Sequence, residues 1–166
     1  MGATMKIILI GFMGSGKTTV ASILAKKLNL EVIEMDDLII KKSGKRINQI
    51  FNQDGEERFR EMEIEVSKSL MSKDECIISS GGGIVMNKIN IDFLRKNGKI
   101  VFLKTSFSEI EKRLKDINDR PLFKDKKIAR KLFTFRKRLY EEYADLIINT
   151  DKKSVEKIAY EIISQN

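Results

Sequence analysis

The chain contains no histidine, one cysteine and one proline. Without histidine, the commonest general base and transition-metal ligand is missing, so any proton transfer must use carboxylates, lysine or water. The single cysteine, Cys76, excludes an internal disulfide, favours a reducing compartment, and opens an apolar run typical of a packed core thiol. No apolar run approaches the ~20 residues that span a bilayer, and no secretory signal is visible. We therefore expect a cytoplasmic protein without membrane contacts.

The bulk composition is that of one folded domain. The 166 residues are 42% hydrophobic and 34% charged, which suits a single domain over residues 1–166. The net charge is +8, and much of the excess lies between Lys124 and Arg138. A nucleic-acid surface would explain this stretch, but we favour a solvated helix near sites for small anions. Phe133 and Phe135 do not alternate with the charges as a base-stacking platform would.

Residues 11–18 read G-F-M-G-S-G-K-T, the phosphate-binding P-loop pattern G-x-x-x-x-G-K-[ST]. An apolar run precedes it and a helical pattern follows it, as the motif requires. Glycine lets the backbone curl with its N–H groups inward, and the following helix N-terminus adds to this anion site. Lys17 can reach the β- and γ-phosphates, and the Thr18 hydroxyl can ligate Mg²⁺. The motif indicates a protein that handles a nucleoside triphosphate.

Strand-like and helical patterns alternate along the chain. The strand-like runs are Lys6–Ile10, Glu31–Ile33, Cys76–Ser79, Lys99–Leu103 and Leu146–Ile148. The helical patterns are Thr18–Leu28, Glu56–Met71, Ile89–Lys96, Ser108–Lys115, Lys127–Tyr143 and Ser154–Ile163. Such alternation predicts a parallel sheet with helices on both faces and ligands beyond the carboxyl ends of the strands.

Acidic residues end the second strand-like run. Glu34 and Asp36 are two residues apart, so in an extended strand they would point the same way. They would suit a Mg²⁺-bound water or a substrate hydroxyl. Alternatively, Asp36 or Asp37 caps a helix that begins there, and the spacing does not decide between the two.

The pattern that opens at Gly55 predicts a helix with an apolar stripe, beside which Glu56, Arg60 and Glu63 share a face. An arginine held between two acids could bind a carboxylate in bidentate fashion. From these residues alone, ordinary ion pairs on a wet surface are the preferred interpretation.

A triple glycine, Gly81-Gly82-Gly83, follows the third strand-like run. Because three consecutive glycines cost much conformational entropy, close approach of the backbone to a ligand is the better explanation. Ser79 or Ser80 before them could hydrogen-bond a metal-bound water. The polar stretch 115–126 is typical of a mobile lid, and its Arg120 could stabilise a transferring phosphoryl group. Taken alone, this arginine is a weak signal, as is Arg136 on the basic helix.

Together these pieces resemble shikimate kinase. The resemblance covers nearly the whole chain, and its motifs here are Glu34-Met35-Asp36, Gly55 to Glu63, Gly81 to Gly83, Arg120-Pro121-Leu122, and Arg136 to Tyr140. It implies a three-layer α/β P-loop kinase fold with five parallel strands in the order 2-3-1-4-5. It also implies phosphorylation of the shikimate 3-hydroxyl by ATP with Mg²⁺, in chorismate and aromatic amino acid biosynthesis. The expected partners are ATP and shikimate, with no nucleic acid, and the chain would be a monomer.

The resemblance also implies site residues. Residues 34–63 would form the substrate-binding region, with Arg60 and Arg136 on the shikimate carboxylate, Asp36 on its hydroxyls, and Lys17, Asp36 and Arg120 in catalysis. The ATP site would comprise Gly14, Ser15, Gly16, Lys17, Thr18, Thr19, Arg113, Arg120 and Lys153. The substrate site would comprise Asp36, Arg60, Gly81, Gly82, Gly83 and Arg136. Thr18, and Glu34 through a water, would hold the metal.

Two departures from the family pattern stand out. Glu34 replaces the first aspartate of a pair, which leaves the metal geometry near it open. Arg138 replaces a usual proline and should make the helix more regular. Two alternatives remain: a kinase for another small polyol acid, such as gluconate, on the same fold, and a nucleotide-dependent nucleic-acid-binding protein. Stimulation of ADP release by shikimate rather than by an oligonucleotide would separate them.

Overall fold

The computed structural model describes residues 5–114 and 125–166. Five parallel strands form one sheet in the order β2-β3-β1-β4-β5. The strands are β1 (Lys6–Ile10), β2 (Glu31–Glu34), β3 (Cys76–Ser79), β4 (Lys99–Lys104) and β5 (Leu146–Asn149). The predicted sheet and its strand order are confirmed, and each predicted strand boundary is within one residue of the observed one.

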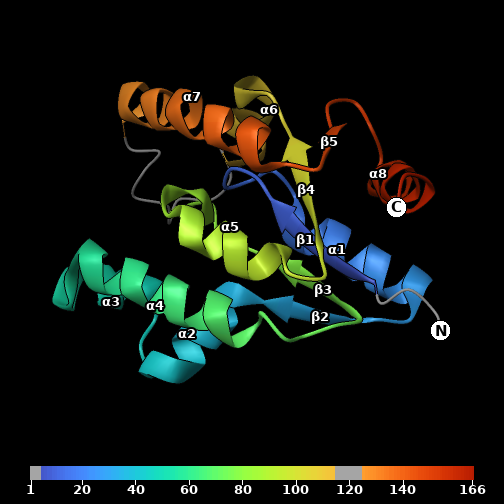
Figure 1. Cartoon of the computed structure of the whole chain (residues 1–166). Helices are drawn as coiled ribbons and strands as arrows, with labels where there is room; N and C mark the ends of the chain where they lie inside the picture. The colour runs from blue at the N-terminus through green and yellow to red at the C-terminus, as the bar shows by residue number, and fades with distance from the viewer. Residues whose placement is uncertain (1–4, 115–124) are drawn as a thin grey trace.

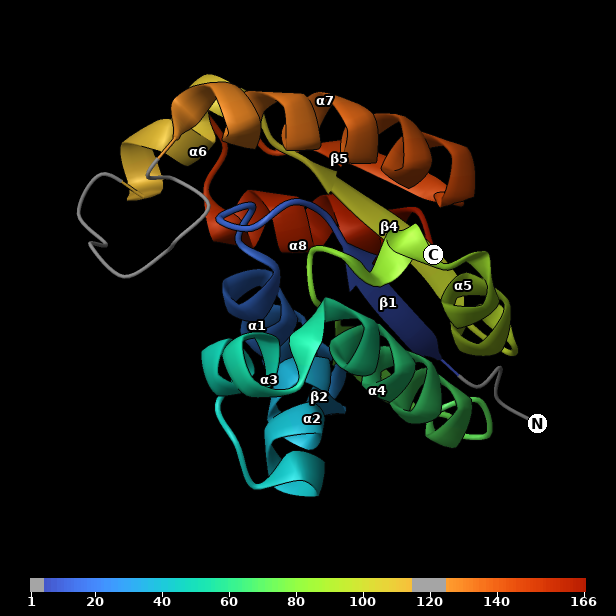
Figure 2. The ribbon, with the colours of Figure 1, turned by 90° about the vertical axis from the view of Figure 1, so that its left-hand side faces the viewer.

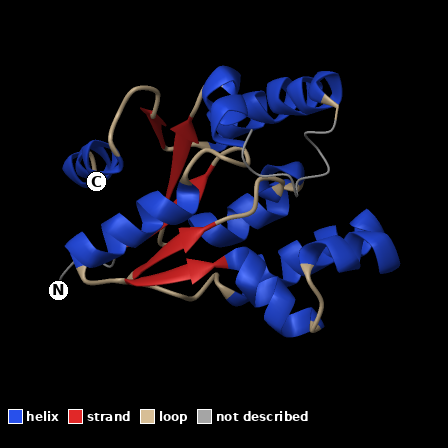
Figure 3. Cartoon of the chain, turned by 180° about the vertical axis from the view of Figure 1, so that it is seen from behind, coloured by secondary structure: helices blue, strands red, loops and turns tan. Residues whose placement is uncertain are grey.

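The helices lie on both faces of the sheet (Figure 1). They are α1 (Lys17–Leu28), α2 (Met35–Ser43), α3 (Ile47–Gln53), α4 (Gly55–Ser69), the 3₁₀ turn η1 (Ile84–Met86), α5 (Lys88–Arg95), α6 (Phe107–Leu114), α7 (Lys126–Tyr143) and α8 (Val155–Ser164). Strand side chains alternate between two cores because successive residues face opposite sides. Ile8 and Ile10 pack beneath α4, α5 and α7, whereas Ile7 and Leu9 pack against α1 and α8. Figure 3 shows α1 and α8 from their own side of the sheet.

The sequence patterns missed the short helix α3 and left a helix at the position of α2 as one of two interpretations. α2 begins directly after β2 with Asp36 and Asp37 in its first turn, and Gly44 ends it at φ 68°. α3 has seven residues, of which only Ile50 is buried. At the carboxyl ends of the strands, α2 and α3 lie next to the start of α4, as Figure 2 shows. Both helices belong to residues 34–63, the expected substrate-binding region.

A buried lysine ties the opposite end of the sheet together. Lys6 is 2% exposed, and its amine donates to the carbonyls of Leu70 (2.9 Å), Met71 (3.4 Å) and Lys96 (3.1 Å). Burial lowers the pKa of this amine. The neighbouring Cys76 is buried as expected, and burial raises the pKa of its thiol. Among the described residues, no helix combines the length and apolar character needed to cross a bilayer.

Candidate active site

The P-loop lies between β1 and α1, beyond the carboxyl end of the central strand. Gly14 and Gly16 have φ values of 78° and 91°, a region that side chains other than glycine rarely adopt. α1 begins at Lys17 and has no acidic residue in its first turn, so its N-terminus is open to an anion. The Lys17 amine donates to the carbonyls of Gly11 (2.7 Å) and Phe12 (3.1 Å). Thr18 and the adjacent Thr19 are exposed at the mouth of the loop.

Arg113 and Lys153 occupy different surroundings. Arg113 comes from α6 and donates from Nη1 to the Gly14 carbonyl at 3.1 Å, so it lies on the P-loop. Lys153 follows β5, and its amine pairs with Glu161 of α8 at 2.9 Å. It makes no hydrogen bond to a P-loop residue within the described part of the chain. The two predicted nucleotide contacts are therefore not equally supported.

Of the two interpretations left open for Glu34 and Asp36, the shared face of an extended strand is wrong. β2 ends at Glu34 and α2 begins at Met35, so Asp36 belongs to a helix. A helix does begin there, but Asp36 and Asp37 lie in its first turn; the N-cap residue is Glu34, which makes no side-chain cap hydrogen bond. Glu34 lies beside Ser79 in the sheet register. Its Oε1 atom is buried and has no hydrogen-bond partner among the described residues.

Each glycine of the triple-glycine loop faces a predicted substrate residue. A Cβ atom at Gly81 would lie 3.0 Å from Asp36 Oδ1, and one at Gly82 would lie 3.6 Å from Arg136 Nη1. At Gly83 it would lie 2.2 Å from Arg60 Nη1, closer than any real Cβ contact. The loop therefore brings an aspartate and two arginines together, although Asp36 reaches it from a helix and not from the end of a strand.

Arg60 is held by acids, as its helix face predicted. Its Nη1 donates to Glu63 at 2.6 Å, and its Nη2 donates to Glu56 at 3.3 Å. The setting is not a wet surface, because the side chains of Arg60 and Glu63 are only 15% and 2% exposed. Burial raises the pKa of Glu63, with the Arg60 guanidinium opposing that shift. An arginine fixed in this way presents its guanidinium in one orientation.

Arg136 enters from α7 and is buried at 6% exposure. Its Nε atom has no hydrogen-bond partner among the described residues. Burial lowers the pKa of this guanidinium, and the positive charge of Arg60 lowers it further. Tyr140, one turn along α7, donates to the Gly82 carbonyl, and burial raises the pKa of its hydroxyl. Two neighbouring guanidiniums with one buried acid between them favour a carboxylate ligand.

The remaining expectations concern Ser80, the lid segment and the metal ligands. Ser80 donates its hydroxyl to the Leu9 carbonyl at 2.8 Å, so it ties β3 to β1 in this structure. Arg120 and residues 115–124 of the expected lid lie outside the described residues. Residue 125 caps α7 by accepting from Lys127 N at 2.9 Å, and α7 begins at Lys126, so the end of the expected lid is helix. Within residues 5–114 and 125–166, no cluster of three or more acidic or cysteine side chains is placed to hold a metal.

Comparison with known proteins identifies the family of this chain. The family model for shikimate kinase matches residues 13–166. The chain belongs to the shikimate kinase family. A shikimate kinase of Sulfurihydrogenibium sp. strain YO3AOP1 is 42% identical over 96% of this chain and 96% of its own length. One of Caldicellulosiruptor saccharolyticus is 45% identical over 95% of this chain and 93% of its own length.

Solved structures of the shikimate kinase family agree with the fold. The Acinetobacter baumannii enzyme in complex with shikimate has a TM-score of 0.90 at 33% identity, covering 96% of this chain and 91% of its own. The Aquifex aeolicus enzyme has a TM-score of 0.84 at 37% identity, covering 96% and 94%. The predicted three-layer P-loop kinase fold is thereby confirmed.

Proposed function

We propose that this chain transfers the γ-phosphoryl group of ATP to the 3-hydroxyl of shikimate, releasing ADP and 3-phosphoshikimate. The observation that carries the proposal is the convergence of Asp36, Arg60 and Arg136 on one glycine loop beside a P-loop. Two fixed guanidiniums suit a carboxylate, and an adjacent aspartate suits hydroxyl groups. The reaction belongs to the route toward chorismate and the aromatic amino acids, which agrees with a cytoplasmic, monomeric enzyme that contacts neither membrane nor nucleic acid.

Catalysis rests mainly on positioning and charge stabilisation. Lys17 exchanges its bonds to the Gly11 and Phe12 carbonyls for phosphate oxygens. Arg60 and Arg136 hold the substrate carboxylate and thereby fix the ring. Asp36 orients the attacking hydroxyl and accepts its proton, because the chain offers no histidine for that task. Arg120 contacts the phosphates from the lid segment 115–126 and stabilises the charge on the transferring group.

The residues fit a magnesium ion held chiefly by phosphates. The Thr18 hydroxyl is exposed at the P-loop mouth, and a metal-bound water would satisfy the partnerless Oε1 atom of Glu34. Because glutamate is one methylene longer than the aspartate that it replaces, Glu34 suits contact with the metal through a water molecule. When bound, Mg²⁺ neutralises charge on the β- and γ-phosphates.

A coupled assay of ADP release tests the proposal. Shikimate should stimulate ADP release, whereas gluconate and a mixed oligonucleotide should not, and ³¹P and ¹H spectra of the product should place phosphate on the 3-hydroxyl. Lys17→Ala should reduce kcat by a factor of about 100 or more, because the contact of its amine with the phosphates is lost. Stimulation by gluconate alone, or by the oligonucleotide alone, would replace the proposal with the corresponding alternative.

A further inference from the structure

A small pocket lies directly behind the P-loop, on the side of α7. Its lining is Phe12, Ser15, Phe102, Leu103, Thr105, Ile110, Phe133, Lys137 and Tyr140. It leaves no space for a water molecule. Phe12 meets Phe133 edge to face, with ring centres 5.3 Å apart, and Phe102 packs on Tyr140 at 5.1 Å. The pocket is thus a dry aromatic layer between the loop and the helix.

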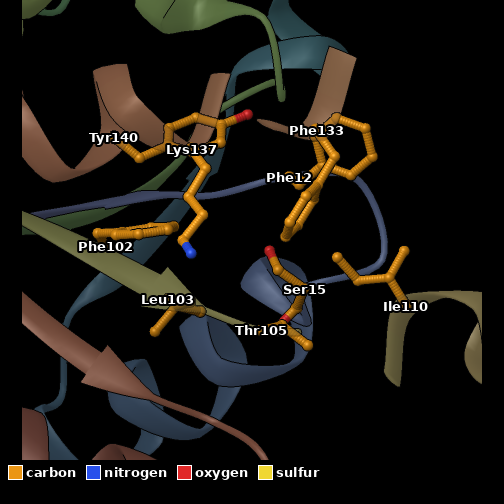
Figure 4. A pocket seen from close by; sticks show the side chains of 9 residues that line it. All are labelled: Phe12, Ser15, Phe102, Leu103, Thr105, Ile110, Phe133, Lys137 and Tyr140. Carbon is orange, nitrogen blue, oxygen red and sulfur yellow. The ribbon is translucent and has the colours of Figure 1, made fainter. Parts of the chain in front are cut away.

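One charged side chain enters this layer. Figure 4 shows Lys137 reaching past the Tyr140 ring, with its amine between Phe102 and Ser15. Within the described residues, the amine makes no hydrogen bond and no short ion pair. Glu141, one turn away on α7, feels the charge of Lys137 but is paired at 2.9 Å with Lys104. Lys137 therefore has no close ionic partner of its own among the described residues, although Glu141 lies near enough to interact with its charge.

Ser15 of the P-loop lies near this amine and, in the described part of the chain, lacks a hydrogen-bond partner for its side chain. Ser15 is 2% exposed, and its hydroxyl has no hydrogen-bond partner among the described residues. Ser15 lies between Gly14 and Gly16, the two glycines that shape the phosphate cradle. The ammonium of the half-buried Lys137 thus stands behind the loop that is to carry a polyphosphate.

We infer that Lys137 is an electrostatic positioning residue for nucleotide binding, which raises the affinity of the P-loop for the phosphates of ATP and ADP from behind. This inference rests on the proposed function, since it requires a nucleotide in the P-loop. At an effective dielectric constant of about 20, a unit charge roughly 10 Å from another changes affinity by on the order of tenfold. Because the Lys137 side chain is half-buried, its charge is screened less than that of a fully exposed lysine. Lys137 touches no substrate and is not a catalytic residue.

Three variants separate charge from packing. Lys137→Met keeps the length and the apolar stem of the side chain but removes the charge, whereas Lys137→Arg keeps the charge. Lys26→Met removes an equal charge at the exposed far end of α1 and controls for net charge. The dissociation constant of Mg·ADP is measured by calorimetry for each protein, together with that of shikimate and the unfolding temperature.

The inference predicts that Lys137→Met weakens Mg·ADP binding by about three- to tenfold and raises the KM for ATP in parallel. Lys137→Arg and Lys26→Met should stay within about twofold of wild type, and shikimate affinity should not change. Unchanged Mg·ADP affinity in Lys137→Met overturns the inference, as does equal weakening in Lys137→Met and Lys137→Arg. Wild-type protein that binds no Mg·ADP would overturn the proposed function itself.

Discussion

A side chain at position 83 would occupy the place of Arg60, because a Cβ atom on Gly83 would lie 2.2 Å from Arg60 Nη1. Gly83 has no positive φ, so the requirement for glycine is one of space and not of backbone conformation. The same guanidinium nitrogen approaches the Gly83 carbonyl at 3.4 Å. The glycine loop therefore sets the position of the arginine.

Gly83→Ala should displace Arg60 and weaken shikimate binding. We expect the KM for shikimate to rise by about tenfold or more, the value of a lost charge-assisted contact. The affinity for Mg·ADP serves as the internal control and should stay within about twofold. Unchanged kinetics in a folded Gly83→Ala variant would show that Arg60 adopts another position without loss.

Glu63→Gln should change the dependence of stability on pH. Burial raises the pKa of Glu63 in the folded protein, so between its unfolded value near 4.5 and the raised value the folded state holds more protons. The wild type therefore loses stability in this window as pH rises, and the variant lacks this loss. As pH rises from about 4.5, the unfolding free energy of Glu63→Gln should therefore increase relative to that of the wild type.

Urea titrations at several pH values would measure that difference. The neutral glutamine also holds Arg60 less firmly, so the KM for shikimate should rise several-fold. A rise of this size corresponds to the difference in strength between a charge-assisted and a neutral hydrogen bond. A difference that stays constant with pH would mean that Glu63 is not desolvated in solution.

Lys6→Met should destabilise the fold without affecting catalysis. The substitution leaves three carbonyls, those of Leu70, Met71 and Lys96, without their donor. We expect a loss of about 1–3 kcal/mol in unfolding free energy by urea titration. Since Lys6 begins β1 and the P-loop follows its other end, kcat and both KM values should match wild type. An unchanged urea midpoint would show that water replaces the amine at no cost.

Arg120→Ala should lower kcat more than it raises the KM for shikimate, because its contact strengthens in the transition state. Amide exchange in residues 115–124 should slow when an ATP analogue and shikimate bind together. Near-normal kcat with equal exchange in both states would make Arg120 a bystander.

The sheet was predictable because buried parallel strands read as apolar runs between glycine or polar segments. The short helix α3 was not predictable, since it buries only Ile50, and α2, which buries Met35 and Ile39, was left as one of two alternatives. The P-loop followed from its motif alone. The interpretation that placed Asp36 on an extended strand with Glu34 was wrong, because β2 ends at Glu34 and a helix begins at Met35.

The roles of Arg60 and Arg136 came from family resemblance. From the residues alone, Arg60 looked like a member of surface ion pairs, because the burial of Glu63 depends on tertiary packing. Lys137 was indistinguishable from its neighbours in the basic helix. Only the packing of α7 on the P-loop turns it inward, and no local pattern carries that information.

The central claim is that Arg60 and Arg136 together bind the carboxylate of shikimate, and a calorimetric cycle of ligand and protein changes tests it most directly. Shikimate and its methyl ester are titrated into wild type, Arg60→Ala and Arg136→Ala. Wild type should prefer shikimate over the ester by at least about tenfold. Either substitution should remove most of that preference while Mg·ADP binding stays intact. An undiminished preference for the carboxylate in both variants would contradict the account.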